Sequence, residues 1–109
     1  MLSILLPVRN ESDSLEDIIE HFSKNLNNIN HEVLIINDFS EDDTLKKSEN
    51  LTFKKKNFRV LNNTKKGLGG AINLGIKESK GINISIMMAD GSDDINDLNN
   101  YNNLINSNN

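Results

Sequence analysis

Three carboxylates follow the last strongly apolar stretch of the chain. The run 82–88 leads directly into a short polar segment that contains Asp90, Asp93 and Asp94. Acids so close together repel one another, and a divalent cation with oxygen ligands at about 2.0–2.6 Å would relieve that repulsion. The segment therefore indicates a site for a hard cation or a phosphate group. A solvated loop that caps the next helix is the alternative.

Length and composition describe one small acidic domain. The chain has 109 residues, of which 36% are hydrophobic and 26% are charged, and its formal net charge is −4. A chain of this length buries roughly 65% of its unfolded surface, so it can hold one modest core. The lack of a dominant basic face argues against nucleic-acid binding. The lack of cysteine excludes disulfides, thiolate nucleophiles and zinc–cysteine sites.

The apolar segments are too short for insertion into a membrane. The first run, residues 2–6, lacks the basic leader and the length of a signal peptide. No run approaches the roughly 20 residues that a membrane-spanning helix needs. We therefore expect a soluble chain with a cytoplasmic location.

The hydrophobic pattern alternates between strand and helix along the whole chain. Short apolar runs predict strands at residues 2–6, 33–36, 58–61 and 82–88, and helical spacing predicts helices at 15–26, 43–50, 69–79 and 95–105. We expect Pro7 to end the first strand, Ser12 or Asp13 to cap the first helix, Ser40 to cap the second, and Gly81 to follow the third. This order predicts an α/β fold with a Rossmann-like parallel sheet and helices on both faces.

A polar segment follows each predicted strand. These segments are residues 7–11, 37–38, 62–70 and 90–94. In open parallel sheets, ligands bind outside the carboxyl ends of the strands, near the point where the strand order reverses. We therefore expect the four loops to converge on one rim and to form the functional site there.

The glycine-rich segment 65–71 does not match the better-known phosphate-binding loops. The dinucleotide fingerprint would find Gly67 and Gly69 but meets Ile72 in place of its third glycine, and a P-loop lacks its Gly-Lys-Ser/Thr triplet. What remains is a flexible basic loop that enters a helix. Lys65 or Lys66 and the amino end of that helix could meet a diphosphate there. Tight packing by small residues is the alternative.

Four ordered motifs together resemble the family-2 glycosyltransferases. They are PVRNE at residues 7–11, EVLIINDFSEDDT at 32–44, KGLGGAINLGI at 66–76 and MADGSDD at 88–94. The most similar branch is that of the polyprenyl-phosphate or dolichyl-phosphate sugar transferases. The resemblance implies a GT-A fold, incomplete in this chain, with residues 1–109 forming the nucleotide-sugar-binding half.

The resemblance also implies which residues bind the nucleotide of the donor. They are Pro7, Arg9, Glu11, Asp38, Lys66 and Gly67. The family pattern D-D-G-S-x-D reads NDFSED at residues 37–42, so its first Asp and its Gly are replaced while Asp38 is kept. The carboxylate of Asp38 can accept two hydrogen bonds from a base or a ribose.

The D-x-D motif of the family reads Met88-Ala89-Asp90 here, so the expected metal site depends on Asp90. Mg²⁺ or Mn²⁺ bound there would neutralise charge on the departing nucleoside diphosphate. Asp93 or Asp94 would assist. Zinc is not expected, because cysteine is absent and both histidines lie apart from the motifs.

The resemblance implies transfer of a sugar, with inversion, from a GDP- or UDP-sugar to an acceptor such as a polyprenyl phosphate or a glycan. A polyprenyl phosphate would place the complete enzyme at the inner face of a membrane. Direct displacement needs a general base, which in similar families lies well beyond the D-x-D region, so the catalytic residue is unknown. We expect the chain alone to be weak or inactive. The alternative is a non-catalytic nucleotide-sugar-binding module.

Overall fold

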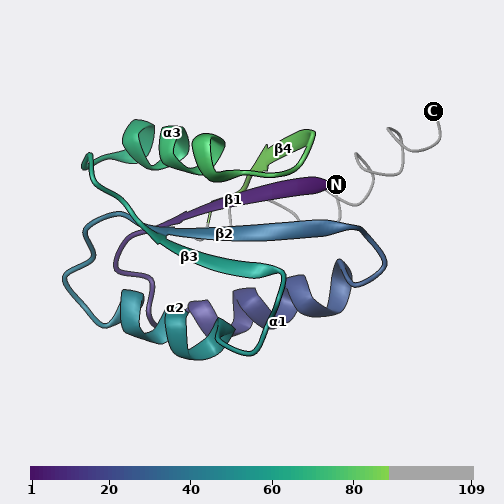
Figure 1. Cartoon of the computed structure of the whole chain (residues 1–109). Coiled ribbons are helices and arrows are strands. Elements are labelled where there is room, and N and C mark those ends of the chain that lie inside the picture. Colours follow the sequence, from purple (N-terminus) through teal and green to yellow (C-terminus); the bar gives the residue numbers. More distant parts are fainter. Residues whose placement is uncertain (89–109) are drawn as a thin grey trace.

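The computed structural model describes residues 1–88, which form a parallel sheet with helices on both faces (Figure 1). The elements in chain order are β1 (Leu2–Val8), α1 (Leu15–Asn25), β2 (His31–Asn37), α2 (Thr44–Thr52), β3 (Phe58–Asn62), α3 (Leu68–Glu78) and β4 (Asn83–Ile86). The predicted α/β class is therefore confirmed. The helix predicted at 95–105 lies outside the described residues. No helix within residues 1–88 is long and apolar enough to cross a bilayer.

The strand order reverses between β1 and β4. The strands lie in the order β3-β2-β1-β4, and every pairing is parallel. The chain thus steps outward from β1 to β3, and α3 then carries it back to the other side of β1. In Figure 1, α1 and α2 cover one face of the sheet and α3 covers the other. The carboxyl ends of β1 and β4 therefore mark the point where parallel sheets bind ligands.

Alternation along β1 divides the core into two layers. Every residue of β1 and of β2 is buried. The even-numbered residues of β1 belong to the layer on the α1 side, which contains Leu2, Ile4, Leu6, Val8, Leu15, Ile19 and Phe22, among others. The layer on the α3 side contains Leu5, Leu34, Ile36 and Ala71. Burial on both faces explains why the central strands read as nearly continuous apolar runs.

Pro7 lies inside β1, so the expectation that it ends the strand is wrong. The carbonyl oxygen of Leu5 accepts a hydrogen bond from the amide of Met87, so this side of β1 faces β4. Successive residues of a strand alternate in direction, and Pro7 therefore faces the β4 side too. Pairing with β4 ends at Leu5. The missing N–H of Pro7 falls beyond that end and costs no ladder hydrogen bond.

The expected caps of the first two helices are also wrong. Ser14, not Ser12 or Asp13, occupies the N-cap of α1, and Asp43 occupies that of α2. The hydroxyl oxygen of Ser40 instead accepts a hydrogen bond from the amide of Asn10, at 3.0 Å. A long-range contact between two loops thus competes with local capping, which sequence spacing alone does not reveal.

Gly81 follows α3 at a distance and does not form its stop. The helix ends at Glu78, with Ser79 as an extended C-cap. A Cβ atom at Gly81 would lie 2.5 Å from the hydroxyl oxygen of Ser3 and 2.6 Å from the carbonyl oxygen of Met1. Only glycine fits at this position, because the backbone of residue 81 lies so close to the start of β1. The strand that follows is shorter than the predicted 82–88.

A buried carboxylate lies near the amino end of the sheet. Glu32 is 7% exposed, and it accepts hydrogen bonds from Ser3 Oγ and from the amide of Lys80, each at 2.6 Å. Arg59 Nη2 lies 3.3 Å from Glu32 Oε1 and also donates to the carbonyl oxygen of Glu78. Burial acts to raise the pKa of Glu32, but these hydrogen bonds and the guanidinium outweigh it and hold the pKa below its ordinary value.

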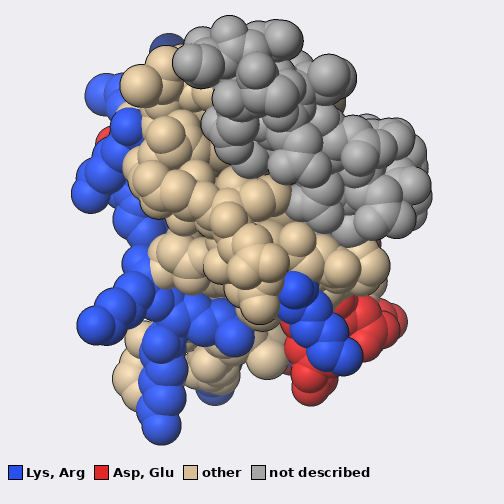
Figure 2. Space-filling model, turned by 90° about the vertical axis from the view of Figure 1, so that its right-hand side faces the viewer, with Lys and Arg blue, Asp and Glu red and all other residues tan. Residues whose placement is uncertain are grey.

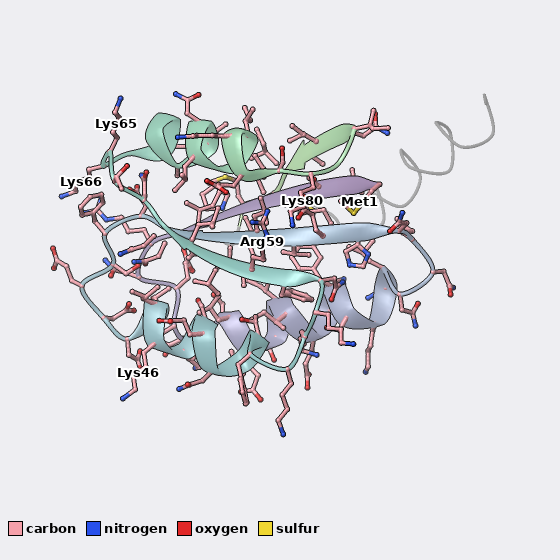
Figure 3. All side chains as sticks on the ribbon, in the orientation of Figure 1. Met1, Lys46, Arg59, Lys65, Lys66 and Lys80 are labelled. Atoms are coloured by element: carbon pink, nitrogen blue, oxygen red, sulfur yellow. The ribbon has the colours of Figure 1, made fainter. Side chains whose placement is uncertain are left out.

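Basic side chains surround this carboxylate at the surface. Figure 2 views the side of the molecule where the strands begin, and Lys and Arg gather along one flank of that face. Arg59 and Lys80 lie near each other in Figure 3. Both line a pocket of about 300 Å³ together with Glu32 and Lys56. The pocket contains none of the residues predicted to bind a nucleotide.

Close packing of α3 on the sheet predicts the effect of Gly75→Ala. A Cβ atom at Gly75 would lie 2.7 Å from Ile36 Cδ1 and 2.9 Å from Leu5 Cδ1. We expect the variant to lose about 1–3 kcal/mol of unfolding free energy, although alanine favours helix. Urea unfolding measures this loss. Gly69→Ala is the matched control, because nothing lies within 4 Å of its added Cβ. Equal stability of the two variants would contradict the packing explanation.

The lowered pKa of Glu32 predicts a pH dependence of stability. A carboxyl group with a pKa that is lower in the folded state stabilises the fold above its unfolded pKa, and the contribution is lost as the pH falls through the folded value. We expect Glu32→Gln to lower the free energy of unfolding by about 1–2 kcal/mol at about pH 7. The variant's unfolding free energy should also fall less steeply than that of the parent between about pH 5 and pH 3. Urea unfolding across this range measures both effects.

Glu78→Gln provides the control for this pH dependence. The Glu78 carboxylate is more exposed and lies 4.0 Å from Arg59 Nη1, so its pairing contributes little. Between about pH 5 and pH 3, the unfolding free energy of a Glu78→Gln variant should therefore fall with pH as steeply as that of the parent chain. If the Glu32→Gln variant shows this same steep fall, the hydrogen bonds of Glu32 do not set the stability in acid.

Candidate functional site

A pocket of about 200 Å³ opens at the carboxyl end of β1, beside the reversal of strand order. Its lining comes from the ends of β1 and β2, the loop after β1, the start of α3 and the segment after β4: Pro7, Val8, Arg9, Glu11, Asp38, Leu68 and Met88. Four of the six residues predicted to bind the nucleotide thus line one pocket. The expected convergence of loops is present for the part of the chain that the structure describes.

Asn10 joins the loop after β1 to the loop after β2. Its side-chain Oδ1 accepts hydrogen bonds from the amides of Glu41 and Asp42, at 2.8 and 3.4 Å. Asn10 has a positive φ of 53°, a conformation that asparagine adopts more readily than most residues. The two loops are therefore tied into one unit, and the flanking residues Arg9 and Glu11 are held beside the pocket.

Glu11 is fixed through its backbone and partly through its carboxylate. Its amide donates to Thr44 Oγ1 at 3.0 Å, and its Oε2 accepts a hydrogen bond from Ser14 Oγ at 3.1 Å. Thr44 is fully buried at the start of α2 and also donates to Asp42 Oδ1. Those hydrogen bonds lower the pKa of Asp42. Arg9 is exposed and forms no ion pair within residues 1–88.

Asp38 is the most constrained acid of the pocket. It is 7% exposed, and its Oδ1 accepts hydrogen bonds from the amide of Gly67, at 2.9 Å, and from Asn63 Nδ2, at 3.0 Å. Its Oδ2 accepts no hydrogen bond from residues 1–88. The fold therefore occupies one carboxylate oxygen and leaves the other without a hydrogen bond from the described residues.

Lys66 and Gly67 do not line the pocket. Gly67 occupies the N-cap of α3 with a φ of 115°, and its amide is bound to Asp38. Figure 3 shows Lys65 and Lys66 projecting outward from the loop before α3. A Cβ atom at Gly70 would lie 2.0 Å from the carbonyl oxygen of Lys65, so this glycine is required by tight packing of the loop. Packing thus explains Gly70, while Gly67 reaches the site through its backbone.

The predicted metal ligand Asp90 lies outside the described residues, as do Asp93 and Asp94. Within residues 1–88, no group of three or more His, Asp or Glu side chains could hold a metal ion. Met88 lines the pocket, and its thioether is a soft ligand that suits neither Mg²⁺ nor Mn²⁺.

Sequence reasoning missed several residues that form the site. Val8 and Leu68 add apolar lining, and Asn10 and Asn63 hold the loops. An asparagine just after a strand is a weak signal for a left-handed turn, which could have pointed to Asn10. Leu68 carried no such signal. Its position at the pocket depends on where α3 begins relative to β1.

Solved structures share this fold. TarS from S. aureus (residues 1–349) aligns with a TM-score of 0.80 and 21% identity, over 97% of this chain and 32% of that chain. The mannosyltransferase PcManGT from Pyrobaculum calidifontis, in complex with GDP-Man and Mn²⁺, aligns with a TM-score of 0.64 and 20% identity, over 82% and 27%. These similarities show a GT-A fold.

A curated relative gives a closer match in sequence. The dolichol-phosphate mannosyltransferase of Pyrococcus furiosus is 33% identical over 90 residues, which are 82% of this chain and 25% of the relative. The chain thus spans about a quarter to a third of the length of these proteins. The pattern of the family described as "Glycosyl transferase family 2" matches residues 3–108. Because this match covers nearly all of the sequence, the chain belongs to glycosyl transferase family 2.

Proposed function

We propose that this chain forms the donor-binding part of a glycosyltransferase and binds a GDP- or UDP-sugar in the pocket at the end of β1. One observation carries the proposal: Pro7, Arg9, Glu11 and Asp38, which come from two separate motifs, line the same pocket. The fold adds support, since PcManGT was solved with GDP-Man and TarS with UDP-GlcNAc.

The chemistry of the lining suits a nucleoside. Leu68, which is exposed, offers an apolar surface to a flat base beside the buried Pro7 and Val8. Asp38 Oδ2 is an acceptor for a base N–H or a ribose hydroxyl, and a hydrogen bond to an ionised carboxylate is stronger than a neutral one. Arg9, exposed and without an ion pair in the described region, is a donor to a carbonyl or phosphate oxygen.

The diphosphate would extend toward the loop before α3. Lys66 is exposed there, next in sequence to Gly67, whose amide is bound to Asp38. Its long side chain ends in an ammonium group, a point charge that can bind a phosphate. We propose Asp90 as the residue that holds Mg²⁺ or Mn²⁺, with Asp93 or Asp94 assisting. A bound ion would neutralise the leaving diphosphate. The Mn²⁺ in the PcManGT complex supports this assignment.

We propose that the complete protein transfers the sugar with inversion to an acceptor such as a polyprenyl phosphate or a glycan. An acceptor oxygen attacks the anomeric carbon as the bond to the nucleoside diphosphate breaks, and a base takes any proton that the acceptor carries. The dolichol-phosphate mannosyltransferase relative favours the lipid phosphate. That acceptor would place the complete enzyme at the inner face of a membrane.

A second candidate is a nucleotide-sugar-binding module without turnover. The observation that favours it is Met88, which stands where the family has the first acid of its D-x-D motif and which lines the pocket. Release of the nucleoside diphosphate from a GDP- or UDP-sugar in the presence of acceptor separates the two candidates. The module would bind the donor and release nothing.

Substitution of Asp90 tests the metal assignment. We expect Mn²⁺ to strengthen binding of GDP- or UDP-sugars to the parent chain, and Asp90→Ala to weaken binding in Mn²⁺ by about tenfold or more, since a bridging charge is removed. Calorimetry with Mn²⁺ and with chelator measures both. Asp17→Ala, on an exposed position of α1, is the control. Binding that neither chelator nor Asp90→Ala alters would refute the metal site.

Asp38→Asn tests the nucleoside contact separately from the metal. The amide keeps an oxygen for Gly67 and Asn63 but replaces the free carboxylate oxygen with a donor. We expect nucleotide affinity to fall by about 10- to 100-fold with little change in melting temperature. Asp42→Asn makes the same chemical change outside the pocket and should bind as the parent does. No binding of any nucleotide by the parent at millimolar concentration would refute donor binding by this chain.

A further inference from the structure

Asn63 is a buried polar residue that no motif singled out. It lies immediately after β3, is 5% exposed, and its amide donates to the carbonyl oxygen of Asn37 at 2.9 Å. That bond completes the last pair of the β2–β3 ladder, Asn37 with Asn62. The side chain is consequently held directly beside Asp38, at the edge of the sheet that carries the pocket.

The side-chain amide of Asn63 uses both its donor and its acceptor groups. Its Nδ2 donates to Asp38 Oδ1, at 3.0 Å, and to the carbonyl oxygen of Lys65, at 2.6 Å, while its Oδ1 accepts from the amide of Lys65, at 3.2 Å. One side chain therefore ties the acid after β2 to the loop before α3. Asparagine suits this position because its short side chain carries two N–H donors and an oxygen acceptor, whereas a hydroxyl group has a single donor.

Asp38 Oδ1 is the common acceptor of this arrangement. It binds Asn63 Nδ2 and the amide of Gly67 together, and Gly67 begins the helix whose first residue, Leu68, lines the pocket. Two donors on one oxygen fix the rotation of the carboxylate, because turning it would break both bonds. The second oxygen is thereby held in one orientation before any ligand arrives.

We propose that Asn63 is a positioning residue of the donor site: it orients Asp38 and fixes the loop 65–67 so that the pocket is preorganised for the nucleotide. This inference rests on the proposed function, since the ligand is a nucleoside diphosphate. Asn63 itself does not line the pocket. It acts on affinity by removing the cost of ordering Asp38 and the loop on binding.

We call the hydrogen bonds that join Asp38, Asn63 and the loop 65–67 the clamp. Asn63→Asp gives the sharpest test, because it makes the clamp depend on pH. The change replaces a donor with a carboxylate oxygen that faces the carboxylate of Asp38. Two acids so close cannot both ionise easily, so the pair retains a proton at weakly acidic pH. That proton restores a hydrogen bond between positions 63 and 38 at low pH, although the donation to the carbonyl oxygen of Lys65 stays lost. Loss of the proton at high pH turns the contact with Asp38 into repulsion.

We expect Asn63→Asp to bind GDP or UDP at least about tenfold more weakly than the parent chain at about pH 8, and this deficit to shrink by at least about threefold at about pH 5.5. Part of the deficit remains there, because the donation to Lys65 is not restored. The parent is titrated in parallel by calorimetry, so that ionisation of the nucleotide cancels in the ratio. A ratio that stays near one at both pH values overturns the proposal, and so does a loss that is the same at both.

Asn62→Asp is the matched control. It makes the same change in charge one residue away, at an exposed position whose Oδ1 only accepts a hydrogen bond from Asn37 Nδ2, at 3.0 Å. A carboxylate keeps that acceptor, so affinity should follow the parent at every pH. If Asn62→Asp reproduces the pH-dependent loss, general charge repulsion and not the clamp is responsible, and the proposal fails.

A second readout separates this inference from the proposed function. The NMR signal of the Gly67 amide reports its hydrogen bond to Asp38 without any ligand. In Asn63→Asp it should move at about pH 8 and return toward the parent position at about pH 5.5. If the parent binds no nucleotide, the proposed function fails. The NMR signal still decides whether the clamp exists, and an unmoved signal overturns it.

Asn63→Ala covers the case in which Asn63→Asp does not fold at high pH. It removes the side-chain hydrogen bonds to Asp38 and to both backbone groups of Lys65 without adding a charge, so affinity should fall by about tenfold at every pH tested. Circular dichroism confirms that the variant is folded. Parent-like affinity in a folded Asn63→Ala variant would overturn the proposal.

Discussion

Burial of β1 and β2 on both faces is the constraint on which the rest of this structure depends. Each residue of these two strands is buried, and their side chains alternate between a layer under α1 and a layer under α3. Parallel strands with both faces covered require a helical crossover between them. The crossovers return the chain to the same end of the sheet each time, so every loop that follows a strand emerges at one edge.

At that edge the strands end, and polar groups of the loops there need hydrogen-bond partners. Asparagine side chains supply several of these partners. Asn10 joins the first two loops, Asn62 accepts a hydrogen bond from Asn37, and Asn63 joins Asp38 to the loop before α3. Amides both donate and accept, so they can bridge backbone groups of either kind. The asparagine content of the sequence is thus partly explained by the architecture of the site.

Much of the fold could be predicted because periodicity is a local property. The alternation of strand and helix, the parallel sheet and the convergence of the loops after the strands all follow from runs of apolar residues and from the rule for strand ends. The resemblance to the family then singled out Pro7, Arg9, Glu11 and Asp38 within those loops. Several of the errors share one cause. The place of Pro7 within β1, the cap of α2 and the close approach of Gly81 depend on partners in distant segments.

The sequence by itself determined the order of the elements and the edge of the sheet where the candidate site lies, because these depend on residue type and spacing. The choice of Glu11 and Asp38 within that edge came from the resemblance to the family. Only the tertiary structure decided that Asp38 commits one oxygen to the fold. Its partners Asn63 and Gly67 lie 25 and 29 residues away in the chain. Such contacts form only when β2, β3 and α3 pack, and they engage Oδ1 while Oδ2 accepts no hydrogen bond from residues 1–88.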